Sequence, residues 1–245
     1  MDRACQLLKV IGRHGARGAR MVDLTGSLAL SRPTVHRLLR SLMNASMVVR
    51  DEATRRYRVG PAVFELGLGA VSPVERLPEF MPAITALAKT TGDMVVVVLR
   101  RGDYCLYIAQ AAGDFPIKID SVRVGDRRPL ASSIAGIAVL GHLQDEEITG
   151  ILDRTADDLK NYSTFTREQV MLQVERVRRV GMSYGDSVIV EGITGIGCAV
   201  PMPYGSPYLG ISIAAISSRM NAERLDMLTA RLQATVKVVG DILSK

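Results

Sequence analysis

The chain lacks several features that would point to particular classes of protein. It has no tryptophan, and its aromatic content is only 4%. Its longest apolar run, Met94 to Leu99, is far shorter than the roughly 20 residues of a membrane-spanning helix. The first residues, MDRACQLL, include an early acid instead of the basic and then apolar stretch of a secretory signal. We therefore expect a cytoplasmic protein that does not bind a membrane.

Cysteine and histidine are also scarce. Cys5, Cys105 and Cys198 are odd in number and share no metal-ligand spacing, which favours small buried side chains in a reducing compartment over disulfides or a zinc site. We expect neither a metal nor a cofactor. Two of the three histidines lie in the first third of the chain, so His142 is the only imidazole in the remainder. This scarcity disfavours nucleophilic catalysis, and we expect a protein that is not an enzyme.

Positive charge is present in excess and is unevenly divided. The formal net charge of the chain is +6. Residues 1–76 carry 13 lysines and arginines against 6 acidic residues, whereas the remaining 169 residues carry 18 against 19. The whole excess therefore belongs to the first third. A small basic domain joined to a larger, nearly neutral one predicts a part that binds a polyanion and a second part with a different task.

The segment SRPTVHRLLRSLM, residues 31–43, predicts a helix with two chemically different faces. At about 100° per residue, its three arginines and His36 fall on an arc of about 140°, and its leucines fall opposite them with Val35. Ser31 can serve as the N-cap residue, and Pro33 stands in the first turn, where its missing N–H costs nothing. One face suits a core, and the other suits anions and base edges.

The segments around this helix predict a winged helix-turn-helix. Apolar spacing indicates helices over residues 2–14 and 21–28, with a tight turn before the helix that begins at Ser31. Residues 47–59, MVVRDEATRRYRV, contain two β-prone runs around a polar turn, which predicts a hairpin that forms the wing. We therefore expect a DNA-binding domain over residues 1–60.

Such a domain divides the work of binding double-stranded operator DNA. A helix in the major groove reads base edges, and arginine matches guanine O6 and N7 there, whereas phosphate contacts fix the register. The candidates for base edges are Arg32, His36 and Arg37. The candidates for phosphate contacts are Ser31, Thr34, Arg40, Arg55, Arg56 and Arg58. A solvated surface charge is an equal alternative for each arginine alone, but the cluster on this motif favours DNA.

The rest of the chain predicts a linker and an α+β domain. A short helix over residues 61–67 and the prolines at 73 and 78 indicate a linker helix over 61–76 and a second domain over 77–245. The predicted helices of this domain cover residues 77–91, 132–143, 146–153, 167–180 and 221–243. The predicted strands cover residues 94–99, 104–110, 117–121, 182–190, 196–202 and 208–216. This order favours an α+β fold with a mostly antiparallel sheet.

Four segments together resemble the IclR family of bacterial transcriptional regulators, namely SRPTVHRLLRSL, RRYRVGP, ALAKTTGDMVVVVLRRGDYCLYI and RVRRVGMSYGD. The resemblance covers nearly the whole chain. It implies an N-terminal winged helix-turn-helix, a linker helix and a C-terminal effector-binding domain with a GAF-like α+β fold, assembled as homodimers or homotetramers. Two DNA-binding domains on one duplex double the contacts and read the spacing of half-sites.

The resemblance also implies a site for a small-molecule effector, an organic or aromatic acid, in the second domain. Carried over position by position, the effector-binding residues are Arg128, Ile134, Ala135, Gly136, Asp186, Cys198, Ser212 and Ala214. A helix N-terminus presents N–H groups to a carboxylate, and a serine adds a hydroxyl donor. Ala131, Ile137 and Ala214 stand where many relatives have histidine, lysine and serine. This departure favours a less polar ligand, for instance an aromatic one.

Other interpretations stay open for the sequence alone. Cys198 can be a core residue, Asp186 a turn residue after Gly185, and Arg128 a solvated loop charge. An enzyme with a DNA-binding appendage would need catalysis by carboxylates alone, and an architectural DNA binder would use the second domain only for oligomerisation. The leading hypothesis is a ligand-responsive, DNA-binding transcriptional regulator, either a repressor or an activator.

Overall fold

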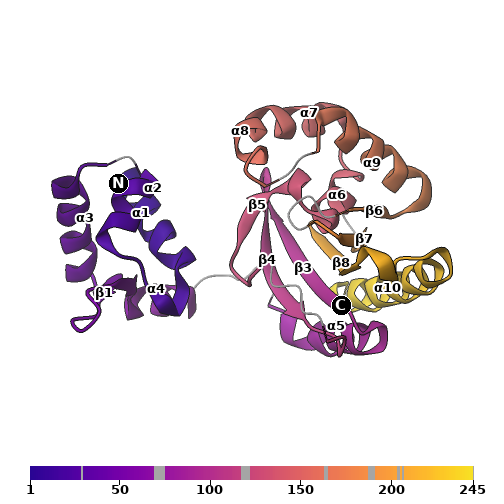
Figure 1. Cartoon of the computed structure of the whole chain (residues 1–245), viewed down its shortest axis with the longest axis horizontal. Helices are drawn as coiled ribbons and strands as arrows, with labels where there is room; N and C mark the ends of the chain where they lie inside the picture. The colour runs from indigo at the N-terminus through magenta and orange to yellow at the C-terminus, as the bar shows by residue number, and fades with distance from the viewer. Residues whose placement is uncertain are drawn as a thin grey trace. The chain divides into compact units, whose positions relative to one another are not determined.

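The computed structural model describes residues 1–28, 30–68, 75–116, 122–162, 165–186, 191–202, 205 and 207–244. They form two compact units, Met1–Glu75 and Arg76–Lys245, each with its own apolar core (Figure 1). Within these described ranges, no helix combines the length and the apolar character needed to cross a membrane.

The first unit packs three helices against each other and against a small hairpin. Its elements are α1 (Asp2–Arg13), a 3-10 turn (Gly15–Arg17), α2 (Met21–Leu28), α3 (Arg32–Asn44), β1 (Val48–Arg50), β2 (Tyr57–Val59) and α4 (Pro61–Leu68). The apolar faces of the first three helices meet in a core that contains Leu7, Ile11, Leu24, Val35 and Leu39, all fully buried. This core holds α3 with its opposite face in solvent.

The hairpin of β1 and β2 is the wing that the sequence predicts. Its two strands pair antiparallel. In the turn between them, the Asp51 carboxylate accepts a hydrogen bond of 2.8 Å from the Thr54 amide, and this bond lowers the pKa of Asp51. Arg55 follows with a left-handed backbone, at φ 54°. Tyr57 exchanges two backbone hydrogen bonds with Ala19, which ties the wing to the segment before α2.

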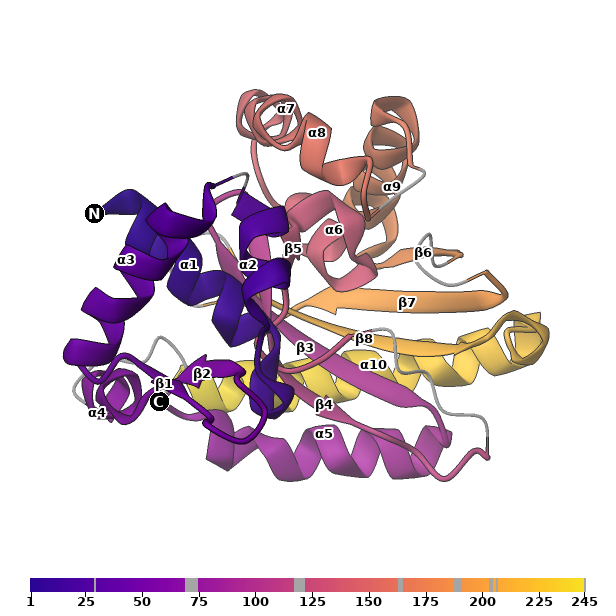
Figure 2. The same cartoon turned by 60° about the vertical axis from the view of Figure 1, so that its left-hand side comes forward.

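The second unit is an antiparallel sheet with helices on both faces. Its strands are β3 (Met94–Arg101), β4 (Tyr104–Ala111), β5 (Arg127–Pro129), β6 (Ser183–Asp186), β7 (Ile193–Ala199) and β8 (Leu209–Ile216), in the spatial order β5-β4-β3-β8-β7-β6. One face carries α5 (Leu77–Thr91) and α10 (Ala222–Leu243). The other carries α6 (Ile134–Leu140), α7 (Asp145–Arg154), α8 (Ala156–Leu159) and α9 (Arg167–Val180), as Figure 2 shows.

Helix α6 lies close on the sheet because the strands beneath it carry glycine. A Cβ atom on Gly210 of β8 would stand 2.3 Å from the carbonyl oxygen of Ala135. A Cβ atom on Gly197 of β7 would stand 3.0 Å from the carbonyl oxygen of Ile134. Larger residues at these positions would force the helix and the sheet apart. The first turn of α6 and the sheet face below it are therefore in direct contact.

The predicted α+β class and antiparallel sheet are confirmed, but some boundaries differ. The helix expected over residues 132–143 is shorter, because a 3-10 turn occupies Leu130–Ser132. Ser133 then caps α6 by accepting a hydrogen bond of 3.4 Å from the Gly136 amide. β5, α8 and the 3-10 turn Ser217–Arg219 were not predicted.

Strand boundaries shift in a similar way. The strand expected over residues 196–202 runs from Ile193 to Ala199. It ends before Pro201, because proline lacks the N–H that a strand ladder requires. The strand expected over residues 117–121 lies outside the described residues, as do residues 187–190 of the strand expected over 182–190.

Candidate DNA-binding surface and effector site

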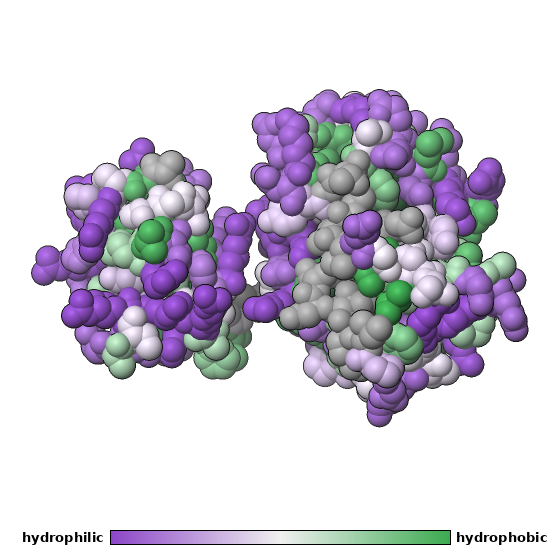
Figure 3. Space-filling view, viewed as in Figure 1, coloured by the Kyte–Doolittle hydropathy of each residue, from purple (hydrophilic) through white to green (hydrophobic). Residues whose placement is uncertain are grey.

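Helix α3 presents a basic face to solvent. Val35, Leu39 and Leu42 turn inward and are buried. The exposed residues of the opposite face are Arg32, His36, Arg37 and Arg40. None of the three arginines forms an ion pair with any residue that the structure describes. Their guanidinium groups are therefore available to phosphates and base edges. Figure 3 shows that hydrophilic residues cover much of the visible face of this unit.

Ser31 and Thr34 stand at the start of this helix. Ser31 occupies the N-cap position with an extended backbone, at φ −64° and ψ 146°. Its hydroxyl bonds the Thr34 hydroxyl at 2.9 Å and not an amide of the first turn. The predicted N-cap is therefore correct for the backbone only. Both hydroxyls stay where a phosphate oxygen could accept their hydrogen bonds.

The arginines of the wing differ from one another in their partners. Arg55 is exposed in the turn. Arg56 donates a hydrogen bond of 2.9 Å from Nη1 to the carbonyl oxygen of Gly18. Arg58 forms an ion pair of 3.3 Å with Asp51, and its side chain is 42% exposed. Arg56 and Arg58 thus hold parts of the first unit together, a role that the sequence pattern does not reveal.

In the second unit, Ser212 and Ala214 lie on the sheet face that α6 covers. Side chains alternate along a strand, and Gly210, two residues before Ser212, faces the backbone of Ala135. Ser212 pairs with Val96 of β3, which belongs to the core under α6. Ser212 is buried, at 5% exposure. The structure thus brings these two residues of β8 to the first turn of α6.

Cys198 lies on the opposite face of the same sheet. It pairs with Ile211 of β8, whose side chain alternates with that of Ser212, whereas Gly197 is the residue of β7 that faces α6. Burial raises the pKa of the Cys198 thiol to about 11, so it stays protonated at neutral pH. Cys198 therefore lies on the face away from Ser212 and Ala214, and its surroundings are those of a core residue. The predicted effector residues are also spread across the sheet, because Arg128 on β5 and Asp186 on β6 stand on its two opposite edge strands.

Arg128 is a buried cation on the α6 face, which excludes the solvated loop charge that the sequence left open. The residue is 8% exposed and pairs in β-sheet register with Cys105. Its guanidinium carbon lies 5.6 Å from the ring centre of Tyr107 and 5.5 Å from that of Tyr162. Its Nη2 lies 3.5 Å from a carboxylate oxygen of Asp126. An arginine within cation–π range of two aromatic rings is suited to bind a planar acid.

Sequence reasoning missed Tyr107 and Tyr162. Tyr107 stands two residues after Cys105 on β4, so strand alternation could have placed both on one face. Burial raises the pKa of the Tyr107 hydroxyl and raises the pKa of the Cys105 thiol to about 12. Both groups are therefore neutral at physiological pH. No local pattern marks Tyr162, which follows α8 and reaches Arg128 only through the tertiary fold.

The first turn of α6 contains Ile134, Ala135 and Gly136, and part of its backbone is engaged. The Ser183 hydroxyl of β6 donates a hydrogen bond of 2.7 Å to the carbonyl oxygen of Ile134. The Gly136 amide donates to the Ser133 hydroxyl at 3.4 Å. Of the amides that we expected to face a carboxylate, that of Gly136 is therefore already used by the cap.

Asp186 ends β6 opposite Thr194 of β7, and only its backbone is described. Among the residues that the structure describes, no group of three or more His, Cys, Asp and Glu side chains could hold a metal ion.

Sequence profiles of protein families match both units. The profile of the IclR helix-turn-helix domain matches residues 1–52, and that of the bacterial transcriptional regulator IclR C-terminal domain matches residues 70–240. The chain belongs to the IclR family. It is therefore a transcriptional regulator whose first unit carries the DNA-binding helix-turn-helix. In this IclR regulator, α3 lies inside the first match, and Arg128 and Ser212 lie inside the second.

Curated relatives and solved structures share this organisation. The HTH-type transcriptional repressor AllR of Salmonella typhi is 28% identical over 244 residues, which cover 99% of this chain and 89% of the relative. AllR of Escherichia coli K12 is 27% identical over 225 residues, which cover 91% of this chain and 82% of the relative. The IclR regulator is thus similar to these repressors over nearly its full length.

Two solved structures illustrate the common fold. An IclR transcriptional regulator from Alicyclobacillus acidocaldarius superimposes with a TM-score of 0.80 at 22% identity, covering 99% of this chain and 98% of the other. An IclR homolog from Microbacterium hydrocarbonoxydans, solved in complex with 4-hydroxybenzoate, superimposes with a TM-score of 0.77 at 18% identity, covering 98% and 97%. At these identities the likeness establishes the fold of the IclR regulator.

Proposed function

We propose that this regulator binds operator DNA through α3 and the wing, and that a small organic or aromatic acid in the second unit changes its affinity for that operator. The observation that carries the proposal is the exposed basic face of α3, whose arginines are not paired with any described acid, above a fully buried apolar face. A structural core needs only the buried apolar face. The exposed basic face suits a polyanion.

On DNA, Arg32, His36 and Arg37 are placed to meet base edges when α3 enters the major groove. Ser31, Thr34 and Arg40 flank them on the same helix, and the exposed Arg55 extends the basic surface to the wing. Because Arg56 and Arg58 have partners inside the unit, we assign them a supporting role beside phosphate contact. We keep the predicted domain limits as part of the proposal: 1–60 for DNA binding, 61–76 for the linker helix and 77–245 for the effector. Residues 69–74 of the linker lie outside the described residues.

For the effector, the α6 face of the sheet supplies the best combination of groups. Arg128 on β5 provides a buried positive charge near the rings of Tyr107 and Tyr162. Ser212 provides a hydroxyl donor farther along the same face, on β8, three strands from β5. A carboxylate matches the charge of Arg128 in place of Asp126, and an attached ring matches the two tyrosine rings near it. The solved IclR homolog that holds 4-hydroxybenzoate supports this class of ligand. Asp186 stays in the proposal only through its match to the family motif, because β6 is the edge strand opposite β5. Cys198 contributes from the far side of the sheet by packing.

We further propose that the regulator acts as a homo-oligomer, and that α4 contributes to the contact between copies. Phe64, Leu66 and Leu68 are between 61% and 72% exposed, and α4 has no buried residue among those described. An apolar helix with this exposure is stabilised when a second copy covers it. A twofold assembly would also place two α3 helices on one duplex, in the cytoplasm where the DNA lies.

The DNA-binding part is tested by Arg37→Gln, with Arg179→Gln on the exposed face of α9 as the matched control. Binding is measured by fluorescence anisotropy on the tightest duplex selected from a random library, over a range of salt concentrations. If Arg37 reads a base, its loss costs about 1–3 kcal/mol and relaxes the preference at one position. Equal weakening on all duplexes would reassign Arg37 to a phosphate. No change in either variant would contradict the proposed surface.

The effector part is tested by thermal unfolding of the full chain with a panel of aromatic and short aliphatic acids. A ligand at about 100 times its dissociation constant stabilises the protein that binds it by about 2.7 kcal/mol. Arg128→Gln should abolish the shift. Recovery of the acid unchanged after prolonged incubation distinguishes a sensor from an enzyme, and turnover would contradict our assignment. A panel without any shift would leave the second unit as an oligomerisation module and overturn the effector proposal.

A further inference from the structure

A hollow between α7, α8 and α9 lies outside the proposed effector site. Its apolar lining consists of Leu152, Ala156, Leu159, Phe165 and Val170, and its volume is about 180 Å³. An engineered protein cavity of about 150 Å³ with similar apolar walls binds benzene, so a hollow of this size accepts one aromatic ring. None of these residues belongs to the proposed effector site.

The floor of the hollow is part of the protein core, and its walls are not fully covered. Leu152 and Val170 are buried, at 4% and 1% exposure. Leu159 and Phe165 are only partly buried and pack against the same core. A ring that fills the hollow would remove the exposed apolar surface of these walls from water, which is the main driving force for binding a small apolar group.

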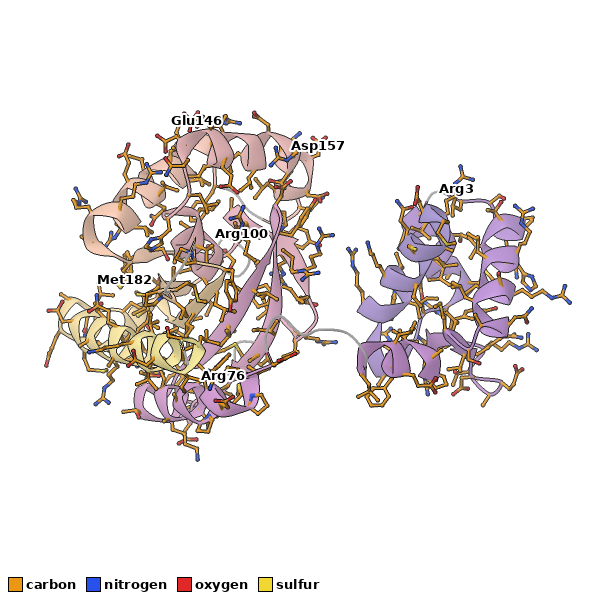
Figure 4. The ribbon with its side chains drawn as sticks, turned by 180° about the vertical axis from the view of Figure 1, so that it is seen from behind. Arg3, Arg76, Arg100, Glu146, Asp157 and Met182 are labelled. Atoms are coloured by element: carbon orange, nitrogen blue, oxygen red, sulfur yellow. The ribbon has the colours of Figure 1, made fainter. Side chains whose placement is uncertain are left out.

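Two cations stand at the rim of the hollow. Lys160 Nζ lies 2.8 Å from Asp157, and Arg167 pairs with Asp153. The aspartate partners are 95% and 63% exposed, and Figure 4 shows Asp157 at the outer edge of this unit. Exposed ion pairs of this kind contribute little to stability. The carboxylate of a ligand can therefore replace an aspartate beside either cation at small cost.

We propose that this hollow is a second small-molecule site, which takes a single-ring aromatic monocarboxylate. The ring lies against Leu152, Phe165 and Val170, and the carboxylate lies between Lys160 and Arg167. This site also borders the region of α6. A Cβ atom on Gly185 of β6 would stand 3.7 Å from Phe165 Cζ and 3.8 Å from Ile134 Cδ1. A ligand that shifts Phe165 therefore acts on the neighbours of the first turn of α6.

The test uses the full chain and the ¹⁹F signal of 4-fluorobenzoate. Ala156→Leu fills the rim of the hollow from an exposed position, and Ala230→Leu makes the same change at an exposed position of α10. We expect Ala156→Leu to raise the dissociation constant of the 4-fluorobenzoate bound in the hollow by about tenfold. Ala230→Leu should leave this constant unchanged. Circular dichroism confirms that both variants fold. Equal binding by the wild type and both variants would overturn the second site.

The chemical class is tested with 4-fluorobenzamide, which has the same ring without the charge. We expect the acid to bind about fivefold more tightly than the amide, the upper end for an exposed ion pair. The double variant Lys160→Gln/Arg167→Gln should bind the acid no more tightly than it binds the amide. Equal binding of both probes to the wild type would overturn the carboxylate assignment.

A variant of the effector site separates this proposal from the proposed function. In Ser212→Ala, the affinity of the 4-fluorobenzoate that is weakened by Ala156→Leu should be unchanged. If Ser212→Ala weakens the binding of 4-fluorobenzoate and Ala156→Leu does not, the second site is overturned and the proposed effector site stays intact. A bound signal that responds only to Ala156→Leu would support the second site and contradict the effector site for this ligand.

Discussion

At the scale of single residues, the partners of a side chain decide its role more than its type does. Arg55 and Arg56 are adjacent, yet one is exposed in the turn of the wing and the other donates a hydrogen bond to Gly18. The sequence alone could not separate them, because Gly18 lies 38 positions away and meets Arg56 only through the tertiary fold. The same holds for Tyr162 beside Arg128.

We predict that substitution of Arg56 affects stability, whereas substitution of Arg55 affects DNA binding. Arg56→Gln should lower the free energy of unfolding by roughly 1–2 kcal/mol, because a charged donor to a backbone carbonyl is lost. Arg55→Gln should leave stability unchanged and reduce the salt dependence of DNA binding by about one phosphate contact. Thermal unfolding and salt titrations of DNA binding measure both. Equal stability of the two variants would contradict the role assigned to Arg56.

Asp103 provides a prediction for low pH. Two hydrogen bonds of 2.8 and 2.9 Å from Arg154 lower the pKa of this carboxyl below its ordinary value. The unfolded chain therefore binds this proton more readily than the folded one, and the stability from the pair is present above pH about 4 and is lost as the pH falls through the folded pKa. Unfolding of Asp103→Asn should depend less on pH below about 4 than that of the wild type.

The companion variant for this prediction is Arg154→Gln, which removes the donor of both hydrogen bonds to Asp103. Its free energy of unfolding should lose the same pH dependence below about 4 as that of Asp103→Asn. Identical acid profiles for all three proteins would show that the Asp103–Arg154 pair does not contribute to acid stability.

At the scale of secondary-structure elements, the contact of α6 with the sheet positions the proposed effector site. Gly210→Ala brings a methyl group within 2.3 Å of the Ala135 carbonyl oxygen, so the helix must move. We expect a loss of about 1–3 kcal/mol in unfolding free energy, as for other overpacked cores. Gly67→Ala in α4, where nothing lies within 4 Å, is the matched control and should gain up to about 1 kcal/mol of helix stability. Equal free energies of unfolding for both variants would contradict the close contact between α6 and β8.

Sequence patterns predicted elements well where a repeating apolar face or a clear turn signal marked them, and poorly where neither did. The bounds of α2, α5 and α9 agree with the predicted helices, because a repeating apolar face and a C-terminal glycine or turn mark them. β5 has three residues and α8 has four, too few for any periodicity. Local signals were therefore sufficient for the main architecture. They were insufficient for β5, which carries Arg128, and for α8, which lines the hollow between α7, α8 and α9.

The proposed effector site shows a second limit of the sequence. Ser212 and Ala214 share one face of β8, as alternation requires, and the structure brings them to α6. Cys198 fails this condition, because one residue along a strand reverses the direction of the side chain. A family motif carried over by sequence cannot detect such a reversal unless the register of neighbouring strands is known.

At the scale of the whole molecule, the two units must communicate for a ligand to control DNA binding. A coupling free energy of about 1–3 kcal/mol changes operator affinity by roughly 5- to 150-fold. The covalent connection between the units is the segment that contains α4 and ends at Glu75. We predict that two glycines inserted after Glu75 will leave DNA binding and effector binding intact and abolish the effect of one on the other. Operator affinity is measured with and without a saturating effector.

The insertion discriminates coupling through the chain from other routes. Two glycines added after Ser244 lengthen the protein by the same amount without altering the connection, so this control should respond to the effector like the wild type. The inserted variant should show equal operator affinity with and without the effector, because flexible residues do not transmit an orientation from one unit to the other. A full response in the inserted variant would show that contacts between units, or between copies, carry the signal instead. By reciprocity, the operator should also cease to alter effector affinity in that variant, and a remaining effect in this direction alone would be thermodynamically inconsistent.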